Sequence, residues 1–118
     1  MKLEMNAACV ADPALIVMPS NAEDVSVALL VAKSASMQVS VRGGGHSYTC
    51  NSVKNNSLHI DMRNINNIQL TSDSRSSTGL AAVLGAGATW GQANKLSVGQ
   101  PKISRASTCL GSAKASFQ

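Results

Sequence analysis

The sequence predicts one folded domain that combines helices and strands, and three observations support this. An apolar run that ends at a proline is followed by a helix start signal and by an apolar stripe with helical spacing. Two later segments with strand patterns each run directly into a glycine-rich loop. The chain has 118 residues, 44% of them hydrophobic, which is enough apolar content for one domain and too short for two.

A strand and then a helix are predicted first. Residues 14–18 form a short apolar run closed by Pro19, which fits a buried strand better than a helix. Ser20 and Glu23 have the spacing of a capping box, so we expect the Ser20 hydroxyl to accept from the Glu23 amide where a helix begins. The apolar stripe of this helix extends to about residue 36. Its members are Val25, Ala28, Leu29 and Ala32.

The second and third predicted strands flank a glycine loop. Val39 and Val41 alternate with polar residues, a period of two that stops at the three glycines 43–45. Residues 58–62 alternate again, with the apolar side chains on one face and His59 on the other. We expect His59 to be a solvent-facing or hydrogen-bonded residue and not a ligand.

The last predicted elements surround a second glycine loop. Residues 65–70 are expected to form an apolar connection, and residues 71–78 a polar surface turn. Residues 80–84 are apolar on both faces, as in a central buried strand, and they lead through glycines to a short helix over residues 92–96. Residues 97–118 show no clear period and are predicted to be loop-like.

Charge and composition exclude several classes of function. The net charge is +4, but the basic residues form no block, and one Phe, one Tyr and one Trp offer little surface for stacking on bases, so a nucleic-acid partner is disfavoured. The longest apolar run, residues 27–32, is far below the roughly 20 residues of a membrane span. The first six residues contain an acid and do not form a signal peptide, so no membrane partner is expected and the compartment stays open.

The three cysteines predict neither a disulfide scaffold nor a metal site. They are too few to pair completely, and none has a spacing to a second cysteine or histidine that is typical of zinc ligands. On spacing alone, Cys9, Cys50 and Cys109 are most simply read as incidental.

The first glycine loop is a candidate anion site. Consecutive glycines can adopt positive φ angles and bring several N–H groups close to a ligand, and Arg42 and His46 flank them with positive or switchable charge. An ordinary tight turn explains the same residues.

Gly85 and Gly87 suggest a dinucleotide fingerprint, but its third glycine is replaced by Trp90 and no acid follows Asp73, so a nicotinamide site is disfavoured.

Four ordered blocks between about residues 10 and 96 resemble one family. They resemble the flavin-binding domain of the vanillyl-alcohol-oxidase and para-cresol-methylhydroxylase (PCMH) superfamily, and most closely its berberine-bridge-enzyme-like branch of FAD-linked oxidoreductases. In chain order the blocks are Pro19-Ser20-x-x-Glu23-Asp24-Val25, Val41-Arg42-Gly43-Gly44-Gly45-His46-Ser47-Tyr48, Ile60-Asp61-Met62 and Gly85-Ala86-Gly87-Ala88-Thr89-Trp90-Gly91.

The resemblance implies an α+β fold, the two-subdomain PCMH-type FAD-binding fold, truncated here in its second half. It implies an N-terminal tail over residues 1–9 and a partial FAD-binding domain over residues 10–118. The first half of that domain is expected at about residues 10–63 and an incomplete second half at about residues 64–118. The chain is therefore expected to be an N-terminal fragment that lacks the substrate domain, with marginal stability and no oxidase activity of its own.

The same resemblance implies the cofactor site. Residues 42–47, which are Arg42, Gly43, Gly44, Gly45, His46 and Ser47, are expected to wrap the FAD diphosphate, with His46 bonded to the 8α carbon of the flavin. Gly85 and Gly87 are expected to approach the cofactor from the second half, and Cys109 stands near the spacing of a second covalent link to flavin carbon 6. No metal is implied, and no catalytic residue can be named.

The implied reaction is hydride transfer from an alcohol or C–H carbon of a small-molecule substrate to the flavin, followed by reoxidation by oxygen. This activity requires a substrate domain to complete the protein. The alternative is a catalytically inactive FAD-binding module or remnant.

Overall fold

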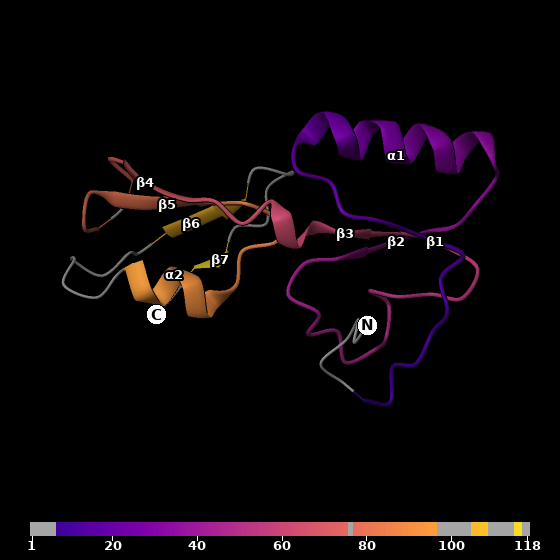
Figure 1. Cartoon of the computed structure of the whole chain (residues 1–118). Coiled ribbons are helices and arrows are strands. Elements are labelled where there is room, and N and C mark those ends of the chain that lie inside the picture. The colour runs from indigo at the N-terminus through magenta and orange to yellow at the C-terminus, as the bar shows by residue number, and fades with distance from the viewer. Residues whose placement is uncertain (1–6, 76, 97–104, 109–114, 117–118) are drawn as a thin grey trace. The chain divides into compact units, whose positions relative to one another are not determined.

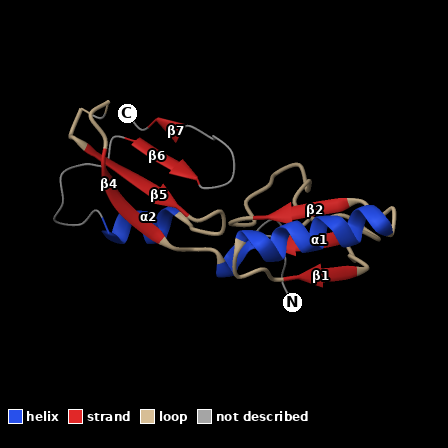
Figure 2. Cartoon of the chain, turned by 90° about the horizontal axis from the view of Figure 1, so that it is seen from above, coloured by secondary structure: helices blue, strands red, loops and turns tan. Residues whose placement is uncertain are grey.

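The computed structural model describes residues 7–75, 77–96, 105–108 and 115–116 of the chain. The chain divides into two compact units, unit 1 from Met1 to Ile65 and unit 2 from Asn66 to Gln118. Among the described residues, each unit has its own β-sheet and one α-helix (Figures 1 and 2). Mixed helices and strands arranged in two subdomains confirm the predicted α+β class.

Unit 1 is a parallel three-stranded sheet with a helix on one face. Its strands β1 (Leu15–Val17), β2 (Val39–Arg42) and β3 (Leu58–Asp61) have the order β1-β3-β2. The helix α1 (Ala22–Ser34) packs on one face, and the connection from β2 to β3 lies on the other (Figure 1). Since central β3 is covered on both faces, all its residues are buried. A short 3₁₀ turn, η1 (Met62–Asn64), follows β3.

The helix α1 begins one residue later than the predicted capping box. Its N-cap is Asn21, whose Oδ1 accepts a hydrogen bond from the Asp24 amide at 2.8 Å. The Asp24 carboxylate in turn accepts from the Ser20 amide at 2.9 Å. The cap therefore resembles a capping box with Asn21 as the N-cap, except that the Asp24 carboxylate accepts from the residue before the cap and not from the cap itself. The prediction that the Ser20 hydroxyl caps the helix was wrong.

Unit 2 is a mixed four-stranded sheet in the order β4-β5-β6-β7. Its strands are β4 (Ile68–Ser72), β5 (Leu80–Leu84), β6 (Arg105–Thr108) and β7 (Ala115–Ser116). β5 pairs antiparallel with β4 and parallel with β6, which confirms its predicted central position. The helix α2 (Trp90–Leu96) contributes Ala93 to a small buried cluster with Ala82 and Leu84 of β5.

Three expectations for unit 2 are corrected by this sheet. The predicted connection over residues 65–70 is largely strand, because Ile68 to Ser72 pair with β5 as β4. The predicted loop over residues 97–118 contains β6 and β7, strands too short for their pattern to be visible and formed through pairing with neighbours. The helix α2 begins at Trp90, two residues early, because Thr89 and Gln92 form its cap through a 2.8 Å bond from the Thr89 amide to Gln92 Oε1.

A disulfide joins Cys9 to Cys50, so the prediction that these cysteines are incidental was wrong. They are 41 residues apart in sequence, and their Cα atoms lie 5.1 Å apart, within the usual range for a disulfide. The spacing carried no signal because the pairing arises from the β2–β3 connection lying beside the N-terminal segment. Cys109 lies outside the described residues.

The described part of the chain contains neither a candidate membrane-spanning helix nor a candidate metal site. None of its helices has the length and apolar character that crossing a bilayer requires. Within the same residues, no three His, Cys, Asp or Glu side chains are grouped as metal ligands.

Candidate functional site

The glycine loop begins where β2 ends and is built tightly around its two flanking side chains. Gly45 is buried and has a φ of +76°, and a methyl group on it would stand 2.7 Å from Nε of Arg42. A methyl group on Gly44 would stand 3.1 Å from Cδ2 of His46. A side chain at Gly45 would therefore clash with Arg42, and one at Gly44 would require His46 to shift.

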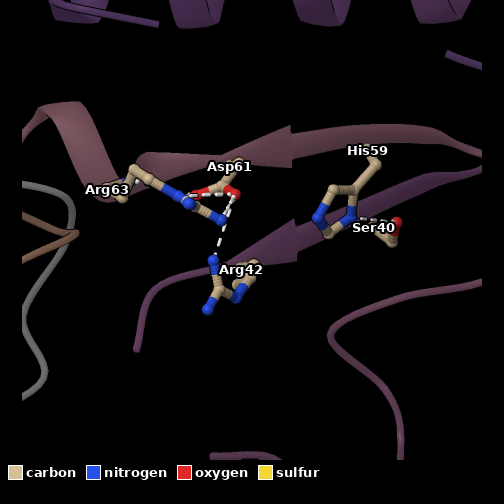
Figure 3. A network of polar contacts seen from close by, with 5 residues as sticks. All are labelled: Ser40, Arg42, His59, Asp61 and Arg63. Carbon is tan, nitrogen blue, oxygen red and sulfur yellow. Dashed lines mark hydrogen bonds and ion pairs between the residues drawn. The ribbon is translucent and has the colours of Figure 1, made fainter. Parts of the chain in front are cut away.

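The buried carboxylate of Asp61 holds Arg42 beneath this loop. The β2–β3 register places Arg42 opposite Asp61, and Nη1 of Arg42 donates to Oδ2 of Asp61 at 3.1 Å (Figure 3). Arg63, on η1, donates to both oxygens of the same carboxylate, with Nε at 3.0 and 2.9 Å and Nη2 at 2.6 Å. The Asp61 side chain is fully buried, whereas 39% of the Arg63 side chain is exposed.

The charges of this cluster favour an ionised Asp61. Burial by itself raises the pKa of Asp61. The hydrogen bonds from Arg63 and the positive charges of Arg42 and Arg63 lower this pKa, and because their combined effect is larger, the pKa lies below its ordinary value. Two guanidinium groups around one carboxylate leave one positive charge uncompensated at the end of β2. Nε of Arg42 is buried without a hydrogen-bond partner among the described residues, beneath Gly45.

Unit 1 is therefore expected to lose stability as the pH falls through the pKa of Asp61. Because folding lowers this pKa below 3.8, the cluster stabilises the fold fully above that pH and progressively less below it. Urea midpoints measured across the acidic range will decline as the pH falls. Arg63→Gln removes the main hydrogen bonds that lower the pKa, so its decline will begin at higher pH. Identical pH profiles for the two proteins would contradict this account of Asp61.

A second polar network connects β2 and β3 on the face of the sheet opposite α1 (Figure 3). The Ser57 hydroxyl donates to the Lys54 carbonyl at 2.8 Å, so its single proton is used and it accepts from Ser40, also at 2.8 Å. Ser40 has then used its own proton and accepts from Nδ1 of His59 at 3.0 Å. The chain of bonds therefore places a proton on Nδ1 of His59. Of the two alternatives expected for His59, the hydrogen-bonded one is confirmed, and the solvent-facing one is wrong because the residue is fully buried.

Removing the middle member of this network is expected to destabilise unit 1. Ser40→Ala leaves the His59 Nδ1–H without its acceptor and Ser57 without its donor, in a position that is 2% exposed. The free energy of unfolding should fall by about 1–3 kcal/mol, the usual cost of unpaired buried polar groups. Ser26→Ala, which removes an exposed hydroxyl bonded to Ala22 of α1, is the matched control and should change stability little. Equal effects of the two variants in urea denaturation would refute a special role for the buried network.

The turn after the glycine loop presents His46 at the surface. His46 is exposed, and the following turn is closed by Ser47, whose Oγ accepts from the Asn51 amide at 3.2 Å. Asn51 also donates from Nδ2 to Thr49 at 2.9 Å. A polar turn therefore fixes the backbone next to an imidazole that is open to solvent.

The structure brings part of the predicted site together. Arg42 is the last residue of β2, and residues 43–47 follow it in the loop and the turn. Gly85 and Gly87 are buried in unit 2 after β5, where the Gly85 amide donates to the Asn67 carbonyl at 2.7 Å. Cys109 is outside the described residues. Asp61 and Arg63 were missed as site residues, although a lone acid within an apolar strand was the signal that could have found them.

Comparison with known proteins identifies the family. A family model described as an FAD binding domain matches residues 13–106. An FAD-dependent monooxygenase of Arthrobotrys oligospora is 35% identical over 70% of this chain and 16% of that protein. An FAD-dependent monooxygenase of Cochliobolus heterostrophus is 36% identical over 72% of this chain and, again, 16% of that protein. The chain thus spans about a sixth of the length of these relatives.

A solved structure shows the same fold. Glucooligosaccharide oxidase from Acremonium strictum, an enzyme with 6-S-cysteinyl, 8α-N1-histidyl FAD, matches with a TM-score of 0.65 and 26% identity. The match covers 87% of this chain and 20% of the oxidase. Together with the family model, this likeness confirms the PCMH-type fold. The chain belongs to the FAD binding domain family of FAD-linked oxidoreductases.

Proposed function

We propose that residues 42–47 hold the diphosphate of FAD and that His46 is its covalent attachment point. The observation that carries this proposal is an exposed imidazole directly after a glycine loop in which a methyl group on Gly45 would clash with Arg42 and one on Gly44 would crowd His46. The family match covers this loop, and the similar oxidase has histidyl FAD. We extend the proposal to Gly85 and Gly87 as backbone contacts from unit 2 and to Cys109 as a second covalent link.

The residues of the loop fit a diphosphate on charge and on shape. Three glycines allow a ligand to reach the loop backbone, and the uncompensated positive charge of the Arg42, Asp61 and Arg63 cluster lies at the base of the loop. Arg42 is not free to turn toward a ligand, because Asp61 holds its Nη1 and Gly45 covers its Nε. We therefore assign Arg42 to supporting the loop and supplying charge from below, and the loop N–H groups to direct contact.

The proposed activity of the whole protein is oxidation of an alcohol or C–H carbon, as in the berberine-bridge-enzyme-like branch. FAD, when bound, supplies the acceptor for two electrons. The described residues of this chain bind and orient the cofactor. The alternative is an FAD-binding module without catalysis, which would bind FAD with no substrate-dependent product. Because two relatives are named monooxygenases, product analysis should distinguish oxygen insertion from peroxide release.

The covalent link is tested by His46→Ala. The wild-type chain incubated with FAD should retain yellow colour in the pellet after denaturing precipitation, whereas the His46→Ala chain should retain only the flavin held through Cys109 while still binding flavin before denaturation. The loop N–H groups remain in the variant, so non-covalent binding persists. Replacing Cys109 as well by serine separates the two proposed links. Flavin that survives denaturation in this double variant would show that His46 is not the attachment point.

A further inference from the structure

The β2–β3 connection that carries His46 is fastened to the N-terminal segment at several points. Toward β3, the Asp12 amide donates to Oδ1 of Asn55 at 2.7 Å, and the Asn56 amide donates to the Asp12 carbonyl at 3.0 Å. The Leu15 amide adds a bond to the Ser57 carbonyl at 3.2 Å. Val53 of the same half is 3% exposed. The half of the connection that leads into β3 is therefore held by the backbone and by burial.

The half next to His46 depends on the disulfide. Cys50 lies four residues after His46, in the polar turn closed by Ser47, and it is bonded to Cys9. Sγ of Cys9 lies 3.7 Å from the Ser47 carbonyl oxygen, so the disulfide rests against the residue that follows His46. The side-chain hydrogen bonds of this turn join Ser47, Thr49 and Asn51 to one another and are exposed. Such bonds shape the turn without attaching it to the rest of unit 1.

We propose that the Cys9–Cys50 disulfide positions the FAD-binding loop, so that reducing it weakens FAD binding without unfolding the sheet. Two thiol groups of a reductant convert the disulfide to two cysteine thiols and become a disulfide themselves, which balances the step. The turn then samples more conformations, and binding must select the competent one, which raises the apparent Kd. This inference rests on the proposed function of the loop.

Linkage makes the effect reciprocal. If reduction weakens FAD binding by some factor, bound FAD must shift the thiol–disulfide equilibrium of Cys9 and Cys50 toward the disulfide by the same factor. Two independent measurements therefore report one coupling free energy. If the disulfide only stabilised the whole unit, its reduction would also lower the hydrogen-exchange protection of the central strand β3.

The test is an FAD titration of the full chain, oxidised and after treatment with a dithiol, followed by flavin fluorescence. We expect the Kd to rise by about five- to tenfold on reduction, at the low end of the range for coupled equilibria. The Cys9→Ser/Cys50→Ser variant should show the weaker affinity already and not respond to the dithiol, which controls for Cys109 and for effects on the flavin. Asn55→Ala, which removes a tie in the half that leads into β3, should leave the Kd nearly unchanged.

The outcomes separate this inference from the proposed function. If the oxidised chain binds no FAD, the proposed function fails and the inference falls with it. If FAD binds equally to the oxidised and reduced chains, the inference alone is overturned. Hydrogen exchange provides the last criterion: amides of residues 47–51 should exchange faster after reduction while those of β3 stay protected. Loss of protection in β3 would show that the disulfide stabilises the whole of unit 1, and would overturn the proposal that it positions the FAD-binding loop.

Discussion

Asp61→Ala is expected to destabilise unit 1 by about 3–5 kcal/mol, the cost of removing one partner from a buried ion pair. The variant leaves Arg42, whose side chain is 14% exposed, without its counter-charge under the glycine loop. It also removes the acceptor of four hydrogen bonds from Arg63. A loss of this size is comparable to the total stability of a small domain. Urea denaturation followed by circular dichroism measures it.

Asp73→Ala is the matched control for this prediction. Asp73 also pairs with an arginine two residues later, but 72% of the Arg75 side chain is exposed, and such pairs contribute at most about 1 kcal/mol. A comparable loss of stability in the two variants would mean that the buried cluster has no greater role than the surface pair.

Gly45→Ala is expected to weaken FAD binding by at least about tenfold, which corresponds to 1.4 kcal/mol. The methyl group would meet Nε of Arg42 at 2.7 Å, and the φ of +76° is unfavourable for alanine. Because Asp61 holds Arg42, the loop backbone must move, and its N–H groups leave the positions that we assign to the diphosphate. An FAD titration measures the effect.

Gly79→Ala separates the clash from the backbone strain. Gly79 has a similar φ of +72° but nothing within 4 Å of an added methyl group, and it lies in the turn between β4 and β5. Its substitution should cost stability and leave the FAD affinity unchanged. If both glycine variants bound FAD with wild-type affinity, the loop would be an ordinary turn.

Local pattern predicted most of the secondary structure of unit 1 and the central strand of unit 2. The proline after residues 14–18 and the three glycines after Arg42 mark real ends of strands, because proline cannot donate to a sheet and consecutive glycines favour loops. The strands β6 and β7 were missed because they are short and are formed by pairing, which no local pattern records.

The candidate site was predictable only where its residues are contiguous in sequence. Residues 42–47 were identified because they are contiguous. Asp61 was read only as part of a family pattern, since its contact with Arg42 depends on parallel register between β2 and β3. The disulfide depends on a long connection returning to the N-terminal segment, and 41 residues of separation leave no trace in sequence spacing. Long-range pairing is therefore where the sequence alone was insufficient.

The central claim is that residues 43–47 contact FAD directly, and hydrogen exchange with and without FAD tests it most directly. The account predicts that saturating FAD slows exchange of the amides of residues 43–47 in the wild-type chain and much less in Gly45→Ala. The amides of α1, which lies on the other face of the sheet from the β2–β3 connection, serve as an internal reference whose exchange FAD should not affect. FAD bound with unchanged exchange at residues 43–47 would contradict the claim and place the cofactor elsewhere on the chain.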